Sequence, residues 1–196
     1  MTWLRLLPYP RRAGRRGLGC DRSALAALEF ALTAPILSVL FIGSVDAAQV
    51  FIAELQLTSA IYSGANYAIV NQANVSSTAG ATLASSIATI VGNVNGSGWA
   101  SGTIVVNNGP TVTFSGGANT ASGTATNADS FYCLTGSPGE WSWGTGQTNN
   151  TASCGASQPS PGKFVTITAS YAVKPIILGL NFGDGQISQS VAVQVQ

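Results

Sequence analysis

The chain has 196 residues and a formal net charge of +1, and only 8 % of its residues are charged, compared with about 25 % in an average soluble domain. It contains no histidine, which excludes histidine-based catalytic triads and dyads and histidine-ligated metal sites. Six of its eight basic residues lie within the first 22 positions, whereas a nucleic-acid-binding domain carries basic residues on its folded part. We therefore expect a membrane-targeted, exported protein that does not bind nucleic acid.

An apolar segment follows the N-terminal arginines. Residues 23–45 contain a single charge, that of Glu29. As a helix they would extend roughly 34 Å, at about 1.5 Å per residue, which is enough to cross a hydrocarbon core of about 30 Å. The arginines hold the N-terminus on the cytoplasmic side, and Pro35 predicts a kink inside the helix. We therefore place a basic leader at residues 1–24 and a transmembrane helix at residues 25–46.

The helical pattern continues beyond this span. Mostly apolar side chains recur at helical spacing, so we expect an amphipathic continuation of the helix over residues 47–72. Because an apolar stripe on a helix needs a partner, we expect this one to pack on the rest of the exported part. The stripe consists of Phe51, Leu55, Thr58, Tyr62, Ala65 and Ile69.

Three interpretations of the N-terminal region remain open. A secretory signal peptide would be cleaved after Ala47 and release a soluble binding module. An uncleaved anchor would give a bitopic membrane protein with an adhesive or scaffolding periplasmic head. A prepilin-type leader would be removed on the cytoplasmic side, so that the apolar helix stays in the mature protein. Glu29 favours the third interpretation, because a carboxylate at mid-bilayer costs about 2.5–3.5 kcal/mol and is usually functional.

The same region carries a family-like pattern of residues. A basic leader and several alanines precede the run Glu-Phe-Ala-Leu, and a proline-containing apolar helix then leads to a glycine and an acidic residue. The segments concerned are residues 22–32, residues 34–37, Gly43, Asp46 and residues 64–68, with a looser similarity over residues 163–196. This pattern resembles the TadE-like pseudopilins, minor pilin-like components of the Tad/Flp tight-adherence pilus system.

The resemblance implies assembly rather than catalysis, so no enzyme activity is expected. A prepilin peptidase would cut between Ala24 and Leu25, where Ala24 stands in the place of the family's usual glycine. Glu29, beside Phe30, would set the register between packed helices, and its carboxylate would pair with the new α-amino group of a neighbouring subunit. The implied partners are the peptidase, other Tad pilins and pseudopilins, the inner-membrane assembly platform and membrane lipid. No cofactor, metal or small-molecule substrate is expected.

The exported part, residues 73–196, is rich in Ser, Thr, Gly and Asn. Its residue patterns predict strands at 103–106 and 111–114 around a turn at 107–110. Further strands are expected at 163–173 and near the C-terminus, whereas residues 79–91 fit either a helix or a strand. We expect an α+β, pilin-like fold in which the long N-terminal helix packs on a small antiparallel sheet. This head would be periplasmic or extracellular, on a protein that crosses the bacterial inner membrane once.

Cysteines in the exported part are expected to form a disulfide. Cys133 and Cys154 enclose a Gly- and Ser-rich loop, and the bridge would contribute about 3 kcal/mol by the chain-entropy estimate. Two buried free thiols are the alternative. Within the loop, Trp141 and Trp143 fit either local packing or an exposed aromatic patch for a partner or a sugar. Cys20 lies in the leader and is expected to be a reduced thiol.

Overall fold

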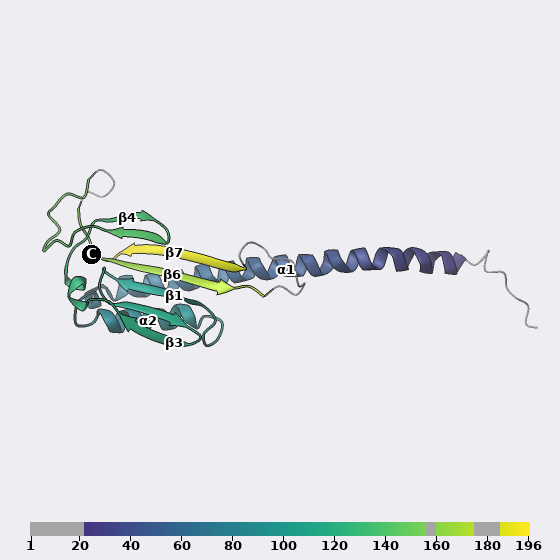
Figure 1. Ribbon diagram of the computed structural model, residues 1–196, viewed down its shortest axis with the longest axis horizontal. Helices are drawn as coiled ribbons and strands as arrows, with labels where there is room; N and C mark the ends of the chain where they lie inside the picture. Colours follow the sequence, from purple (N-terminus) through teal and green to yellow (C-terminus); the bar gives the residue numbers. More distant parts are fainter. Residues whose placement is uncertain (1–21, 156–159, 175–184) are drawn as a thin grey trace, which may run out of the picture. The chain divides into compact units, whose positions relative to one another are not determined.

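The computed structural model describes residues 22–155, 160–174 and 185–196 of the chain, with side chains from Leu25 onward (Figure 1). Contacts divide the chain into two compact units, one that ends at Gly43 and one that comprises Ser44–Gln196. We call them the N-terminal unit and the head, and describe each by itself. Residues 1–21 of the predicted leader lie outside the described residues.

One helix, α1 (Arg22–Val70), begins in the N-terminal unit and ends in the head. The expected single long helix is confirmed, and it continues through Pro35. The kink at Pro35 stays a prediction, as do the boundaries at residues 24 and 46.

The head is built around an antiparallel five-stranded sheet with the strand order β3-β2-β1-β6-β7 (Figure 1). A second sheet pairs β4 with β5, and these two strands lie in the cysteine loop region. The head's other elements are η1 (Gln72–Asn74), α2 (Gly80–Gly92), β1 (Ser101–Val106), β2 (Thr111–Ser115), β3 (Ala118–Ser122), η2 (Ala125–Asp129), β4 (Leu134–Ser137), β5 (Glu140–Trp143), β6 (Phe164–Ala172) and β7 (Gln186–Gln194). The α+β class and the antiparallel sheet agree with the sequence prediction.

The predicted hairpin is present as β1 and β2. Asn107 and Asn108 both have positive φ, 51° and 53°, and asparagine tolerates this left-handed region better than most residues. The N–H of Gly109 donates to the carbonyl of Val106 at 3.0 Å, which closes the turn. Two central residues with positive φ match the twist of the flanking strands, so this turn fixes the register Val105↔Thr111.

One face of the sheet carries the core of the head, which α1 and α2 cover together. Residues 79–91, which the sequence left between helix and strand, are helical, and α2 buries one side from Leu83 to Val91. On β6 the expected alternation holds, since Val165, Ile167 and Ala169 belong to the core. Ile187, Val191 and Val193 of β7 pack against the same core, as the alternation near the C-terminus predicted.

The packing face of α1 is the one point where the fold contradicts the sequence analysis. Most of the apolar stripe expected to pack on the head is exposed, including Phe51 and Tyr62, at 68 % and 60 % of their surface. Ala65 is its buried member. Another face of α1 is buried instead, and it consists of Ala53, Leu57, Ala60, Ile61, Gly64, Ala65 and Ala68. The prediction was wrong because α1 is apolar on two faces, and small residues on one of them allow the closest approach to the sheet.

Candidate functional site

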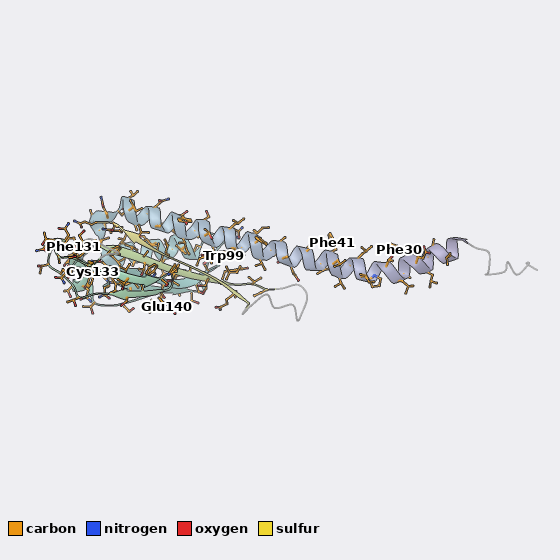
Figure 2. The ribbon with its side chains drawn as sticks, turned by 90° about the horizontal axis from the view of Figure 1, so that it is seen from above. Phe30, Phe41, Trp99, Phe131, Cys133 and Glu140 are labelled. Carbon is orange, nitrogen blue, oxygen red and sulfur yellow. A yellow bond between two sulfur atoms is a disulfide. The ribbon has the colours of Figure 1, made fainter. Side chains whose placement is uncertain are left out.

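The N-terminal part of α1 presents apolar side chains to its surroundings in every direction. The large apolar residues between Leu25 and Phe41 are between 58 % and 71 % exposed, and Phe30 and Phe41 project from the helix in Figure 2. Burying a side chain of this size is worth about 1.5–3 kcal/mol, and a helix that is apolar all round is a core helix or a membrane span. Among the described residues, α1 is one helix that is long and apolar enough to cross a membrane.

The hydroxyl groups within this apolar segment are satisfied by the helix itself. Thr33 Oγ1 donates to the backbone carbonyl of Glu29 at 3.0 Å, and Ser38 Oγ donates to that of Ala34 at 2.8 Å. Bonds of this kind to the preceding turn are common for Ser and Thr in helices. They remove the cost of unpaired hydroxyls in lipid, so neither residue prevents the segment from spanning a bilayer.

The sequence-predicted assembly residues all lie in this same stretch of α1. The peptide bond between Ala24 and Leu25 is in the first turn of the helix, and Glu29 follows one turn after Leu25. The Glu29 side chain is exposed, next to Phe30, which is 69 % exposed. The helix thus brings the processing site, the carboxylate and the phenyl ring into one continuous segment. Their roles in processing and register remain predictions.

In the head, α1 has two apolar faces with opposite properties. The buried face is closely packed because a Cβ at Gly64 would lie 2.9 Å from Val91 Cγ2 and 3.1 Å from Ile87 Cγ2. Leu57, in the middle of this face, is 0 % exposed, whereas Leu55 is 69 % exposed. We call the second face the exposed stripe, and it consists of Phe51, Leu55, Tyr62 and Ile69.

A disulfide joins Cys133 to Cys154, with 5.4 Å between the two Cα atoms. The tryptophans of the enclosed loop pack locally, in keeping with the first of the two sequence interpretations. The Trp143 ring makes edge contacts with Tyr132 and Phe164, at centroid distances of 5.6 and 6.5 Å. Trp141 Nε1 donates to Ser190 Oγ at 3.3 Å. Because Ser190 is on β7, this contact ties the cysteine loop to the main sheet.

The sequence indicated that Asn107 is a turn residue, but it did not predict the hydrogen bonds that the Asn107 side chain makes. Asn107 is 0 % exposed. Its Nδ2 donates to the carbonyls of Ala128 and Ser130, at 2.9 and 2.6 Å, and its Oδ1 accepts from the backbone N–H of Phe164 at 3.2 Å. One amide therefore connects the hairpin, the segment before the cysteine loop and β6. A local turn motif carries no signal for partners so far away in the sequence.

Two charged groups of the head, Lys163 and Asp129, are engaged with the backbone. Lys163 Nζ donates to the carbonyl of Val75 at 3.2 Å and lies 5.4 Å from the centre of the Phe131 ring. Hydrogen bonds from the side chain and the backbone N–H of Ser77, the latter at 2.9 Å, hold the pKa of Asp129 below its usual range. Within the part of the chain that the structure describes, no group of three or more Cys, Asp or Glu residues could hold a metal ion.

The structure combines a helix that is long and apolar enough to cross a membrane with an α+β head, in which the continuation of that helix packs on an antiparallel sheet. The model of the family described as TadE-like protein matches residues 25–66, which confirms the resemblance found in the sequence and supports a TadE-like protein of the Tad pilus system. The match covers most of α1 and none of the strands. No curated protein and no solved structure matches the chain.

The family bears on function at a coarse level. TadE-like proteins are pilin-like structural components and not an enzyme family. Together with one long apolar N-terminal helix, the match supports a single-pass membrane protein associated with the Tad pilus. The matched residues include Phe51, Leu55 and Tyr62, three of the four members of the exposed stripe.

Proposed function

We propose that the protein is a minor pilin-like subunit needed to assemble a Tad/Flp-type adhesive pilus, and that it acts through α1 after processing by a prepilin peptidase. One observation carries this proposal. The helix that the family model matches is apolar on all sides in its first part, and in the head it keeps a second apolar face that the fold leaves uncovered. A self-contained head does not need that second face, whereas a subunit of an assembly does.

The first step is insertion and processing. The arginines of the leader stay in the cytoplasm while α1 enters the inner membrane and the head is exported. Cleavage between Ala24 and Leu25 then leaves a positively charged α-amino group on Leu25, one turn before the Glu29 carboxylate. In lipid, an isolated carboxylate is costly. We infer that Glu29 of one subunit pairs with the α-amino group of a neighbour and thereby sets the register of the two helices.

The second step is packing of the exposed stripe. The occupant we assign to it is the α1 helix of a neighbouring pilin or pseudopilin, because the stripe lies on the same helix as the apolar segment and three of its four members lie within the matched region. The head, closed by its own core and by the disulfide, remains on the outer side of the membrane. Packing of this kind needs no cofactor and no chemistry by the protein itself.

Processing is tested by the intact mass and N-terminal sequence of the full protein extracted from membranes of cells with and without the prepilin peptidase. The proposal predicts a start at Leu25 that depends on the peptidase. A start at Met1 in both samples would mean a permanent anchor with an adhesive or scaffolding head. A start at Ala48 would mean a signal peptide and a released binding module. An Ala24→Gly variant, which restores the family's usual residue, serves as a control that the site is accessible.

The role of Glu29 is tested separately with Glu29→Ala. This variant is expected to insert into the membrane as well as the natural chain, because it removes a charge from the apolar segment. The yield of sheared pili is expected to fall steeply. Normal piliation with a processed Glu29→Ala protein would contradict the proposed pairing. Glu54→Ala, a change to an exposed carboxylate on the same helix, is the matched control and should leave piliation unchanged.

A further inference from the structure

A groove in the head lies beside α1 on a side different from the exposed stripe. It has a volume of about 310 Å³, at the lower end of the range of about 300–1,000 Å³ for ligand pockets. Three surfaces meet there: one side of α1, the segment between α2 and β1, and the end of β6 with the residues after it. Its lining includes Gln49, Gln56, Asn95, Trp99, Tyr171 and Lys174.

An aromatic pair forms one wall of this groove. The rings of Trp99 and Tyr171 are stacked, with centroids 4.4 Å apart and an angle of 16° between their planes, and Figure 2 shows Trp99 beside α1. Both rings are only half-buried. Tryptophan and tyrosine are enriched where a protein meets the boundary between lipid and water, because one part of each ring system is apolar and another forms hydrogen bonds.

The remaining walls provide hydrogen-bond donors and one positive charge. Asn95 Nδ2 donates to Gln56 Oε1 at 2.8 Å, which joins the loop after α2 to α1, and the amide of Gln49 lines the same groove. Lys174 is exposed at the groove, and it is one of only two basic residues after Arg22 in the whole sequence. None of the described residues that line the groove carries a carboxylate. The site is therefore suited to an anion.

The place of the groove along the chain selects the kind of anion. Gln49 follows the end of the predicted span, residue 46, by three residues, which corresponds to about 4–5 Å along a helix at 1.5 Å per residue. With the span ending at residue 46, the phosphate groups of lipids would lie near this level of the helix, and the positive charge of Lys174 would attract them. Ile52 and Val173, which also line the groove, would contact the apolar part next to the headgroup.

We propose that this groove binds the phosphate-containing headgroup of an anionic phospholipid, with Lys174 as the charge partner and the Trp99–Tyr171 pair as an interfacial anchor. The inference rests on the membrane insertion contained in the proposed function, but not on processing or pilus assembly. Binding would hold the head against the outer surface of the membrane before the subunit is taken up by the pilus machinery.

The test uses the full chain, purified in detergent and offered equal amounts of phosphatidylglycerol and phosphatidylcholine, with retained lipid counted by native mass spectrometry. The proposal predicts that the natural chain retains more phosphatidylglycerol. Lys174→Gln is expected to lower that preference about fivefold, the change expected for one basic residue at an anionic surface. Lys174→Arg should keep it. Lys163→Gln removes the same charge elsewhere in the head and is the matched control.

Three results would overturn the proposal. They are equal retention of the two lipids by the natural chain, an unchanged preference in Lys174→Gln, or displacement of the lipid by an equal concentration of soluble glycerol 3-phosphate, which would make the groove a site for free phosphate esters. Trp99→Phe, which keeps an aromatic ring, checks the anchor and should weaken retention of both lipids. Carbonate extraction of membranes reports insertion separately, so failure of the proposed function is distinguishable from failure of this site.

Discussion

The two apolar faces of α1 in the head have different compositions and different neighbours. The buried face is made mainly of small residues around Leu57 and Gly64, and it lies against α2 and β6. The exposed stripe contains larger side chains, from Phe51 to Ile69, that contact little within the head. The buried face combines small residues with Leu57 and Ile61, and its small residues let the helix approach α2 and the sheet closely. The larger side chains are then available for another surface.

The two faces of α1 should differ most in the loss of stability that follows from shortening a leucine on each of them. Leu57→Ala should destabilise the head by about 2–5 kcal/mol, because it leaves a cavity in a fully packed core. Leu55→Ala should change stability by no more than about 0.5 kcal/mol, as is usual for exposed positions. Denaturant unfolding of the full protein in detergent measures both. Equal losses in the two variants would show that the faces do not differ in the way described here.

Removal of the disulfide should affect the stability of the head without affecting the insertion of α1 into the membrane. The double variant Cys133→Ser with Cys154→Ser is expected to lower head stability by about 3 kcal/mol, because the unfolded chain gains conformational freedom. Membrane insertion should stay unchanged, since the bridge is not part of α1. Denaturant unfolding compared with and without reductant gives the effect on the natural chain. An equal midpoint in both conditions would contradict the stabilising role.

The side-chain amide of Asn107, in the turn between β1 and β2, offers a third test of the packing within the head. Asn107→Ala leaves the carbonyls of Ala128 and Ser130 without their donor, and each buried unsatisfied group costs about 1–3 kcal/mol. Asn108→Ala also places an alanine at a positive φ, so it is the matched control for backbone strain. We expect Asn107→Ala to be less stable than Asn108→Ala by about 2 kcal/mol in thermal unfolding. Equal stabilities would mean that the side-chain hydrogen bonds contribute nothing.

The smallest expected effect concerns pH. Because hydrogen bonds from Ser77 lower the pKa of Asp129 in the folded head, its contribution is complete above the ordinary aspartate pKa of about 3.9. That contribution is lost as the pH falls through the lower folded value. Melting temperatures measured between pH 5 and pH 2, an interval of about one to two units on each side of that ordinary value, should fall less steeply for Asp129→Asn than for the natural chain. Identical slopes would show that the contacts with Ser77 do not stabilise the charged carboxylate.

Much of the fold was predictable because its signals are local. The length and composition of residues 23–45 predicted the apolar helix, and the alternation in residues 163–173 predicted β6. The asparagines at 107 and 108 indicated the turn. The packing face of α1 was not predictable in this way, because two faces of one helix have similar hydrophobicity and only the shape of the sheet decides between them. Helix α2 was ambiguous for a related reason, since a short apolar run fits either structure.

The residues of the candidate sites were likewise predictable only where their signal in the sequence is local. Glu29 was recognisable from sequence alone because a charge is unusual in an apolar segment. The groove beside Trp99 was not, because it depends on Gln49, Asn95 and Lys174, which are far apart in the sequence and meet only in the folded head. The exposed stripe was visible as a pattern, but the pattern does not reveal that the head leaves these side chains uncovered.

The measurement that tests the central claim most directly is pilus yield from cells carrying Leu55→Ser with Tyr62→Ser. Both side chains are on the exposed stripe, so the account predicts a folded head with an unchanged melting temperature, a normally processed N-terminus and a strongly reduced yield of sheared pili. A normal yield of pili from this double variant, with the head folded and the protein present at its usual level, would contradict the account.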